Sequence, residues 1–294
     1  MKKTITKVRK SLQLRFEIFN LMRSLFASSI NSHKVESVIQ RLSLRFDVDL
    51  LNLAHHNWGI ARPIDFDSTG ERFLLNHTLK RYIRKDKPIL FDVGANVGDY
   101  SQELSRAFPN GIIYSFEPNR EAFEYAADNL APFGVHCYNL GLGANSGKAK
   151  IYTYADDRLS QHASLYKEVF LDLHKADKLS EFEFQLTTID EFCERHRIDF
   201  IDFIKIDTEG HELEVLKGAA RMLAENRISI IQFEFNTLHV ISRVFLKDFY
   251  EFLEGHNIFR LNANRLMPLF EYSTVNEIFR FQNLLAVSKT VALN

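Results

Sequence analysis

Cysteine is scarce in this 294-residue chain. The two cysteines, Cys137 and Cys193, lie far apart and form no Cys-x-x-Cys pair. Two such thiols do not build a disulfide framework, and they lack the ligand spacing of a zinc site. We therefore expect a protein of the reducing cytoplasm, and we assign no metal ion to it.

Long apolar runs are missing as well. No hydrophobic stretch approaches the roughly 20 uninterrupted residues that span a bilayer. In the basic N-terminal stretch, Arg15, Glu17 and Arg23 interrupt the apolar core that a signal peptide requires. The formal net charge of −1 gives no overall attraction to nucleic acid. These absences predict a cytoplasmic protein with no transmembrane segment and no nucleic-acid partner.

Two common catalytic motifs are also absent, the Gly-x-Ser-x-Gly elbow and the Gly-x₄-Gly-Lys phosphate loop. Their absence excludes typical esterases and the common nucleoside triphosphatases. Phenylalanine, by contrast, is abundant: the chain has 26 such residues within a hydrophobic share of 46%. That composition predicts a globular protein with a full, aromatic-rich core.

The first 85 residues have a helical pattern, with apolar residues at steps of three and four. The pattern predicts helices over Leu12–Phe26, Val35–Phe46 and Glu71–Ile83. We interpret residues 1–85 as an N-terminal helical extension and residues 86–294 as the catalytic domain. The basic first helix is expected to pack on that domain or on a partner subunit, and a membrane surface is the alternative.

After Pro88, short β-rich runs alternate with helical periods. Such alternation predicts a Rossmann-like α/β fold, with a mainly parallel sheet covered on both faces. The segment Ala144–Asp199 is expected to be an irregular insertion that carries substrate-binding residues. The expected strands are Ile89–Val93, Ile112–Glu117, Val135–Leu140, Phe200–Ile206, Ile228–Phe235, Ile258–Asn262 and Asn283–Ser288. The expected helices are Asp99–Ala107, Arg120–Leu130, Leu213–Ala224 and Arg243–Gly255.

The strongest local motif is FDVGANVGDYS, which closes the first strand and opens a helix. Gly94 allows a sharp turn and a close approach of a ligand to the backbone. Asn96 tolerates left-handed geometry, and Gly98 starts a helix whose N–H groups are expected to face a carboxylate. Asp92 is expected to orient the loop or to hold a ligand ammonium group through water.

The second motif is YSFEPN, in which Glu117 closes the next strand about 20 residues after the glycine loop. An acid at this spacing reaches ribose hydroxyls. Pro118 fixes the turn that leads through Asn119 into the next helix. A dinucleotide site needs G-x-G-x-x-G, whereas this loop has G-A-N-V-G followed by Asp, so the spacing favours an adenosyl ligand over NAD.

The third strand leads into NLGLG, and its backbone at Gly141 and Leu142 is expected to lie near the adenine edge. The fourth strand ends at Asp207, in IKIDTEGHELEVLKG. Residues just beyond the carboxyl end of a parallel strand face the ligand crevice. We therefore expect Asp207 beside the Gly94 loop, where its charge balances a cationic ligand.

Four segments together resemble the successive motifs of FkbM-type methyltransferases: FDVGANVGDYS, YSFEPN, NLGLGANSGKAKIY and LTTIDEFCERHRIDFIDFIKIDTEGHELEVLKGA. The similarity covers about Leu90 to Glu234, and Ser68–Leu75 resembles the segment that precedes the family's domain. The resemblance implies a class I methyltransferase fold, with a seven-stranded, mostly parallel sheet. It also implies transfer of the methyl group of S-adenosylmethionine to a hydroxyl of a small metabolite or a glycan sugar.

Transfer to a hydroxyl needs a base, and His211 is the first candidate because imidazole titrates near neutrality. Glu209 is the second candidate, and the alternative for His211 is a local hydrogen bond at a helix start. Glu234 closes the fifth strand and is assigned to the acceptor pocket. Asp207, Glu234 and Asn236 offer oxygen ligands for Mg²⁺, but their spacing is not distinctive, so no metal is assigned.

The sequence leaves two other functions open. One is an NAD-dependent oxidoreductase on the same fold, which the spacing of the glycine loop disfavours. The other is a non-catalytic protein that keeps the methyltransferase fold without its chemistry.

Overall fold

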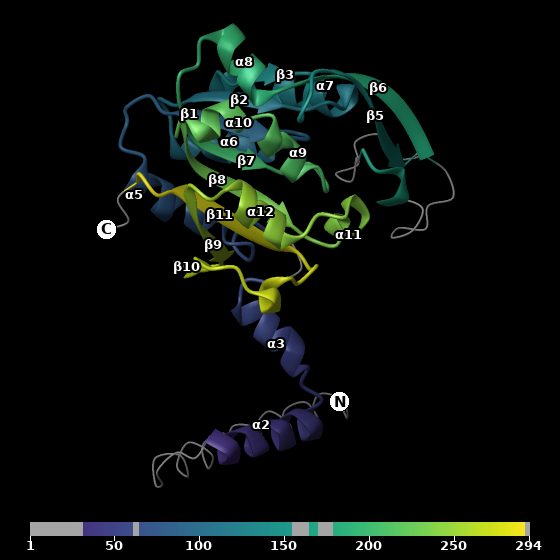
Figure 1. Cartoon of the computed structure of the whole chain (residues 1–294), viewed down its shortest axis with the longest axis vertical. Coiled ribbons are helices and arrows are strands. Elements are labelled where there is room, and N and C mark those ends of the chain that lie inside the picture. The colour runs from purple at the N-terminus through teal and green to yellow at the C-terminus, as the bar shows by residue number, and fades with distance from the viewer. Residues whose placement is uncertain (1–31, 61–64, 155–164, 170–178, 292–294) are drawn as a thin grey trace, which may run out of the picture. The chain divides into compact units, whose positions relative to one another are not determined.

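The structure is a computed structural model that describes residues 32–60, 65–154, 165–169 and 179–291. It divides into two compact units, Met1–Ala54 and His55–Asn294. The first unit contains α2 (Ser32–Phe46), as expected from the sequence pattern, and α3 (Leu50–Asn57) runs across the division (Figure 1). The helix expected over residues 12–26 lies outside the described residues.

An eight-stranded sheet forms the centre of the second unit, with the order β10-β9-β11-β8-β7-β1-β2-β3 (Figure 1). Five neighbouring strands, from β8 to β3, pair in parallel, and β11 pairs antiparallel to both β8 and β9. The strands are β1 (Ile89–Val93), β2 (Ile112–Phe116), β3 (His136–Tyr138), β7 (Ile201–Ile206), β8 (Ile228–Phe235), β9 (His256–Asn262), β10 (Arg265–Pro268) and β11 (Gln282–Ser288). The expected fold class is confirmed, and β10 is an eighth strand added at the edge.

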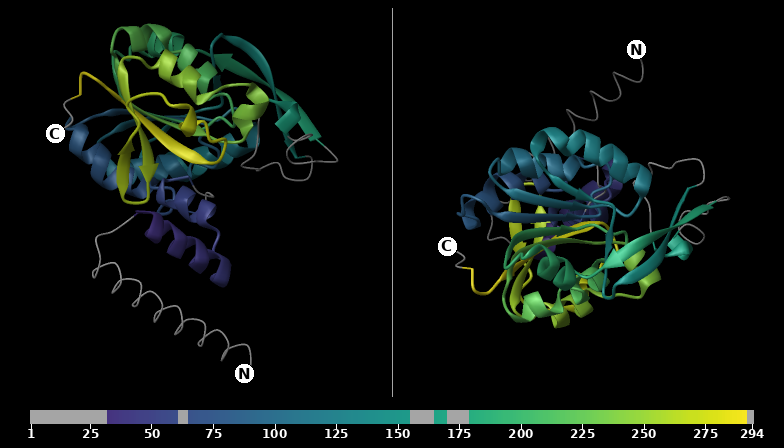
Figure 2. Two further views of the ribbon diagram at one scale, coloured as in Figure 1. Left: turned by 60° about the horizontal axis from the view of Figure 1, so that its bottom comes forward. Right: turned by 90° about the horizontal axis from the view of Figure 1, so that it is seen from above.

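Helices cover both faces of the sheet (Figure 2). Because side chains alternate along a strand, Phe91 of β1 packs into one core and its neighbour Leu90 into the other. The Phe91 core contains residues of α8 (Ile189–His196), α9 (Glu212–Lys217), α10 (Ala220–Ala224) and α12 (Leu246–Phe252). The Leu90 core contains residues of the π-helical segment η1 (Leu74–Leu79) and α6 (Asp99–Ala107); η1 lies between α4 (Glu71–Phe73) and α5 (Lys80–Tyr82).

Several helices follow the expected bounds and others do not. α6 and α7 (Arg120–Leu130) have the bounds expected from the sequence. The helix expected over Leu213–Ala224 breaks into α9 and α10 near Gly218, where the backbone lies against Gly143: a Cβ on Gly218 would lie 2.1 Å from the Gly143 carbonyl oxygen. The helix expected over Arg243–Gly255 begins at Leu246, and the short α11 (Leu238–Ser242) precedes it.

The expected aromatic core is confirmed on the Phe91 side of the sheet. The buried ring of Phe192 meets the ring of Phe116 at 4.8 Å between centroids and that of Tyr138 at 5.0 Å, both edge to face. Each such pair stabilises the fold by about 0.5–1.5 kcal/mol beyond the burial of its area. This packing fixes α8 beneath β1, β2 and β3, whose carboxyl ends carry the Gly94 loop and Glu117.

The expectation of an irregular insertion over Ala144–Asp199 is wrong for much of this segment. β5 (Gly147–Tyr154) and β6 (Leu179–Thr187) form a long antiparallel hairpin that joins β4 (Gly141–Leu142) in a second, three-stranded sheet. The hairpin projects from the main sheet beside α11 (Figure 1). Its charged residues alternate with apolar ones, and Lys150 pairs with Glu181 across the strands at 2.8 Å. This alternation is typical of a strand with one exposed face.

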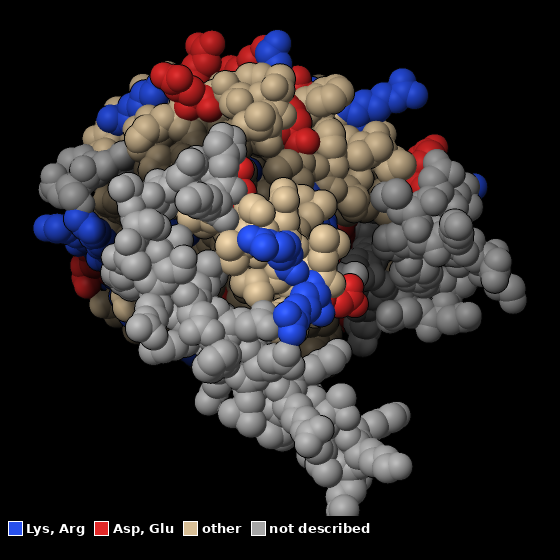
Figure 3. Space-filling model, turned by 90° about the horizontal axis from the view of Figure 1, so that it is seen from below, with Lys and Arg blue, Asp and Glu red and all other residues tan. Residues whose placement is uncertain are grey.

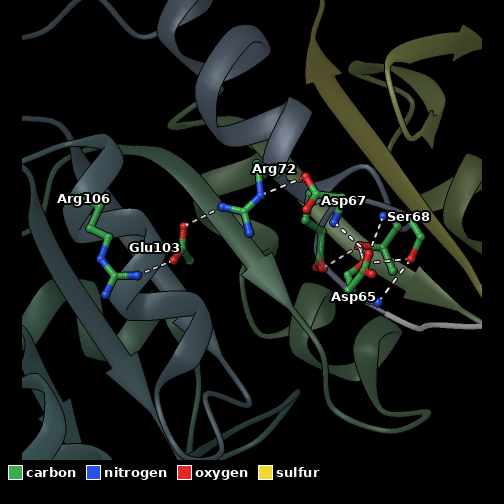
Figure 4. Close-up of polar contacts among 8 residues, drawn as sticks. Asp65, Asp67, Ser68, Arg72, Glu103 and Arg106 are labelled. Atoms are coloured by element: carbon green, nitrogen blue, oxygen red, sulfur yellow. Dashed lines mark hydrogen bonds and ion pairs between the residues drawn. The ribbon is translucent and has the colours of Figure 1, made fainter.

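The segment before β1 packs as part of the second unit. Leu74, Leu75 and Leu79 are buried in the Leu90 core. Figure 4 shows the chain of ion pairs that ties the segment to α6: Arg72 bridges Asp67 at 2.9 Å and Glu103 at 3.4 Å, and Arg106 also pairs with Glu103. The boundary expected at residue 86 therefore marks the start of the strand–helix alternation, while packing continues back to His55.

The surface drawn in Figure 3 carries both signs of charge, with Lys and Arg side chains lying among Asp and Glu. This mixture agrees with the formal net charge of −1. In the part of the chain that the structure describes, no helix is long and apolar enough to cross a membrane.

Candidate active site

A cavity of about 770 Å³ opens where the carboxyl ends of β1, β2, β7 and β8 meet. Its size lies in the range of small-molecule sites. The β5–β6 hairpin and residues 65–71 also contribute to its walls. The predicted site residues that line it are Gly94, Asn96, Glu117, Pro118, Leu142, Asp207, Glu209, His211 and Glu234. Four others are not among its lining residues: Asp92, Gly98, Asn119 and Gly141.

The glycine loop has the left-handed backbone that its sequence predicts, with φ of 81° at Gly94, 48° at Asn96 and 91° at Gly98. The reason why glycine is required at two of these positions differs from the expected one. A Cβ on Gly94 would lie 1.7 Å from the carbonyl oxygen of Asp207, and one on Gly98 would lie 2.8 Å from the Leu130 side chain. These glycines therefore allow the loop to pack against β7 and α7, and Gly94 at the same time borders the cavity.

Glu117 holds this loop in place. One carboxylate oxygen accepts the backbone N–H of Asn96 at 2.7 Å, and the other accepts that of Asn119 at 2.8 Å. The Asn119 side chain in turn accepts the N–H of Glu121 and caps α7, which explains its place outside the cavity. Burial raises the pKa of Glu117 to about 7, against the opposing effect of the two backbone donors.

The pH dependence of stability tests this environment. Because the folded pKa is raised from 4.5 to about 7, the protein should lose stability as the pH rises through that window. The loss attributable to Glu117 is about 3 kcal/mol at most. Urea unfolding between pH 4.5 and 8 measures this loss. The free energy of unfolding of the wild type should fall relative to that of Glu117→Gln, a variant that keeps a carbonyl acceptor. Parallel curves for the two proteins would contradict a shifted Glu117.

Lys205 is a buried cation at the floor of the cavity. Its ammonium group lies 2.8 Å from Oδ2 of Asp207 and 4.7 Å from the ring centroid of Tyr100. Burial alone would lower the pKa of Lys205, but the nearby carboxylates of Asp207, Asp92 and Glu71 outweigh it and raise the pKa. Lys205 is therefore charged, and its charge is already matched by Asp207.

Asp92 lies behind the loop and is fully buried. Its Oδ2 accepts the Ser101 hydroxyl at 2.6 Å, while its Oδ1 has no hydrogen-bond partner. Burial raises its pKa, although Lys205 opposes the shift. Of the two roles expected for Asp92, this geometry agrees with orienting the loop.

Glu71 belongs to a buried polar network that the motifs did not indicate. Its carboxylate accepts the Thr69 hydroxyl at 2.9 Å and the Gln232 side-chain amide at 3.0 Å. The Gln232 carbonyl oxygen accepts the Tyr100 hydroxyl at 2.6 Å. Burial raises the pKa of Glu71. The network brings the segment before β1 to the same cavity wall as Lys205 and Asp207.

Glu234 lines the cavity near the end of β8. Its Oε2 accepts the side-chain N–H of Asn236 at 3.1 Å. Burial raises the pKa of Glu234 well above its usual value, and the charges of Asp207 and Glu209 raise it further. Among the described residues, no group of three or more His, Cys, Asp and Glu side chains is arranged to hold a metal ion.

The loop after β7 is held by a buried pair, Glu212 and His239, whose side chains are both 0% exposed. Oε2 of Glu212 lies 3.1 Å from Nε2 of His239. The other oxygen accepts the backbone N–H of Thr208 at 2.8 Å and that of Gly210 at 3.3 Å. Nδ1 of His239 accepts the N–H of Asn236 at 3.2 Å, so the pair joins the loops that follow β7 and β8.

His211 and Glu209 lie on this loop and line the cavity. Glu209 has a left-handed φ of 55°. Nδ1 of His211 lies 3.4 Å from the Tyr166 hydroxyl, whereas its Nε2 is buried near Gly143 without a hydrogen-bond partner. Burial lowers the pKa of His211 below 6.5, which keeps the ring neutral near pH 7 and able to accept a proton.

One part of the cavity wall is apolar. Its residues come from the loop after β3, from β4 and from the hairpin: Leu140, Leu142, Ile151, Phe184 and Leu186. Gly141 lies beneath the Phe184 ring, where a Cβ would be 2.3 Å from the ring carbon Cε2. Gly141 therefore shapes the wall through packing, and Leu142 supplies surface to the cavity.

The family model of the methyltransferase FkbM domain matches residues 92–260, more than half of the chain. The chain belongs to the FkbM methyltransferase family. The match confirms the resemblance that the four sequence motifs indicated. The cavity described above is thus the crevice of an FkbM methyltransferase domain, with residues 65–71 added to it from outside the matched range.

Curated relatives of this FkbM protein are methyltransferases by name. Hexuronic acid methyltransferase AglP of Haloferax volcanii is 26% identical over 168 residues, covering 56% of this chain and 63% of AglP. The 2-O-methyltransferase NoeI of Sinorhizobium fredii is 19% identical over 167 residues, covering 53% of this chain and 68% of NoeI. The chain thus spans a little under two thirds of the length of AglP.

Solved structures also resemble this FkbM chain. A crystal structure of methyltransferase FkbM from Methylobacillus flagellatus aligns with a TM-score of 0.44 and 16% identity, over 73% of this chain and 47% of that one. The N-terminal domain of human METTL16 in complex with SAH aligns with a TM-score of 0.41 and 11% identity, over 80% of this chain and 78% of that one.

Proposed function

We propose that this FkbM-family protein transfers the methyl group of S-adenosylmethionine to a hydroxyl oxygen of a sugar or another hydroxylated metabolite. One observation carries the proposal. The glycine loop and Glu117 border the same cavity as Asp207, His211 and Glu234. The residues proposed to bind the nucleoside and those proposed to bind the acceptor therefore border one cavity.

The residues present fit an adenosyl ligand. The apolar wall around Leu142 and Phe184 offers surface for the base. Each Glu117 oxygen accepts one backbone N–H, and its second lone pair is available to a ribose hydroxyl. Asp207, which lines the cavity and pairs with Lys205 through Oδ2, would also favour a cationic sulfonium beside it. When bound, S-adenosylmethionine supplies an electrophilic methyl group whose bond to sulfur breaks as the new bond to oxygen forms.

The chain's own residues would position the acceptor and remove its proton. The hydroxyl oxygen must be held about 3–3.5 Å from the methyl carbon, and Glu234 and Asn236 supply acceptor-side polar groups at the cavity wall. As the oxygen–carbon bond forms, the hydroxyl proton passes to His211. The products are a methyl ether, a neutral thioether and protonated His211.

The names of the relatives support a sugar as the acceptor. AglP is named for a hexuronic acid and NoeI for 2-O-methylation. A hexuronic acid is a carbohydrate and 2-O-methylation is transfer to an oxygen, so the two names together support transfer to an oxygen of a sugar. The cytoplasmic location expected from the cysteine content is part of the same proposal.

Calorimetry tests the proposed ligand directly. The full chain should bind S-adenosylmethionine and S-adenosylhomocysteine and give no heat with NAD at matched concentrations. Glu117→Ala should weaken cofactor binding by a few kcal/mol at most, since it removes one charged hydrogen bond. NAD binding would favour the oxidoreductase alternative. Cofactor binding without transfer to any acceptor would favour a non-catalytic protein.

A further inference from the structure

Lys205 and Asp207 lie in the middle of the proposed site. Neighbouring strands in this part of the sheet have the order β8-β7-β1-β2; Glu234 belongs to β8, and Glu117 directly follows β2. Lys205 belongs to β7, and Asp207 directly follows it. All four residues line the cavity. A ligand that reaches from the nucleoside end at Glu117 to the acceptor end at Glu234 must therefore pass over the ends of β1 and β7.

The two side chains form a fixed ion pair at this point. Nζ of Lys205 lies 2.8 Å from Oδ2 of Asp207 and 4.7 Å from the centroid of the Tyr100 ring. The backbone N–H of Asp207 donates to the carbonyl oxygen of Val93 at 2.9 Å, which holds the residue beside the glycine loop. The Lys205 side chain is 7% exposed and that of Asp207 is 27% exposed. The carboxylate is therefore the more accessible of the two charges, and the ammonium group offsets it from the buried side.

The charge of the methyl donor changes during the proposed reaction. S-adenosylmethionine contains a positively charged sulfonium, whereas S-adenosylhomocysteine contains a neutral thioether. The two molecules have the same remaining charged groups, so the difference between their affinities reports the electrostatic environment of the sulfur. A carboxylate whose charge is not offset would favour the sulfonium over the thioether. Stabilisation that is stronger in the ground state than in the transition state slows the transfer.

We propose that Lys205 is a positioning residue that acts through Asp207, fixing the carboxylate and offsetting its charge so that the site does not bind the cationic donor too tightly relative to the neutral product. This inference rests on the proposed methyltransferase function and deepens it. It gives a functional reason for a lysine in the fully buried strand β7, where a charge is costly even when it is paired.

A second lysine–aspartate pair on β7 provides a matched control. Nζ of Lys85 lies 2.8 Å from Oδ1 of Asp202 and 4.2 Å from the centroid of the Phe200 ring. Asp202 is near the amino end of β7, and these three residues are outside the described lining of the cavity. The two pairs thus have the same chemical groups at opposite ends of one strand. Loss of Lys85 should leave the relative affinities of the two ligands unchanged.

Titration calorimetry with S-adenosylmethionine and with S-adenosylhomocysteine measures the ratio of their two dissociation constants. The full-length wild type is compared with Lys205→Met at pH 8, well above the ordinary titration range of a carboxyl group. The ratio should shift toward tighter binding of S-adenosylmethionine by a factor on the order of tenfold, the size of one partly screened charge interaction. Lys205→Arg keeps the charge and should keep the wild-type ratio, as should Lys85→Met.

Asp207→Asn tests the same inference independently, and it carries the test if Lys205→Met does not fold. This variant removes the carboxylate and keeps the buried lysine, so its ratio should shift in the opposite direction, toward S-adenosylhomocysteine. A shift in opposite directions is not expected from a general loss of structure, which weakens the binding of both ligands together.

The inference and the proposed function fail in different ways. An equal loss of affinity for both ligands in Lys205→Met, an unchanged ratio in Asp207→Asn, or the same shift in Lys85→Met would overturn the inference and leave the proposed function intact. A wild-type chain that bound neither ligand would overturn both.

Discussion

Replacing Glu212 by alanine should lower the free energy of unfolding by about 2–5 kcal/mol, because it leaves Nε2 of His239 and the backbone N–H of Thr208 without an acceptor. Both side chains are fully buried, and their N–O distance is 3.1 Å. Burial alone would raise the pKa of Glu212, but His239 and the Thr208 N–H outweigh it and lower the pKa. Glu212 is therefore ionised in the folded state. Urea unfolding at pH 7 measures the loss.

The helix that carries Glu212 also offers a control. Glu214 pairs with Lys217 at 2.6 Å, but both side chains are partly exposed, at 31% and 43%. Surface pairs of this kind contribute about 0–1 kcal/mol, so Glu214→Ala should change stability far less. If Glu212→Ala and Glu214→Ala lowered the free energy of unfolding equally little, the buried pair would not hold the loops together.

The Glu212 pair shows why part of the site could not be read from the sequence. The acidic run after Asp207 predicted side chains facing the crevice, and Asp207, Glu209 and His211 do line the cavity. Glu212 belongs to the same run but turns inward to His239, on a different element. The sequence pattern gives the strand end, whereas the tertiary contact decides which carboxylate is buried.

The sequence around Lys205 could have predicted a buried ion pair, although the motifs alone did not indicate it. It lies in FIKID, where a lysine interrupts an apolar, fully buried strand. A charge in such a place needs a partner, and Asp207 two residues later lies on the same side of a strand. Glu71 had no comparable signal, because its partner Gln232 comes from a distant segment of the chain, as does Tyr100, whose hydroxyl donates to Gln232.

The parts of the fold with strong local patterns were predicted well. The apolar runs of β1, β7 and β8 and the bounds of α6 and α7 appear at or within a residue of the expected positions. β10 was missed because it is a short edge strand without a buried face. The β5–β6 hairpin was missed because its alternating charged and apolar residues were interpreted as an irregular insertion.

The glycine loop illustrates a correct prediction with a different cause. Gly94 and Gly98 were expected to make room for a ligand, and their left-handed backbone is as predicted. The space beside each is filled by the protein itself, through Asp207 and Leu130. A single sequence indicates that a side chain is not tolerated, but the structure shows which neighbour excludes it.

Replacing His211 by alanine should slow methyl transfer by a factor of about 10²–10⁴, the usual contribution of a positioned general base. The affinity for S-adenosylmethionine should be unchanged, because no cofactor-binding role is assigned to the imidazole. The wild-type rate should fall as the pH drops through the lowered pKa of His211, and this fall should come at a lower pH than an exposed histidine would give. Single-turnover transfer of an isotopically labelled methyl group to a hydroxylated acceptor measures the chemical step.

Tyr166→Phe is the control for the position of the ring. It removes the hydroxyl that lies 3.4 Å from Nδ1 of His211 but leaves the imidazole in place, so its effect on the rate should be smaller. Glu234→Gln tests Glu234 as the alternative base, because burial raises the pKa of Glu234 toward neutrality. If His211→Ala kept full turnover and Glu234→Gln lost it together with the acid limb of the pH profile, the proton would pass to Glu234. The role of His211 would then be confined to the packing of its loop against Gly143 and Tyr166.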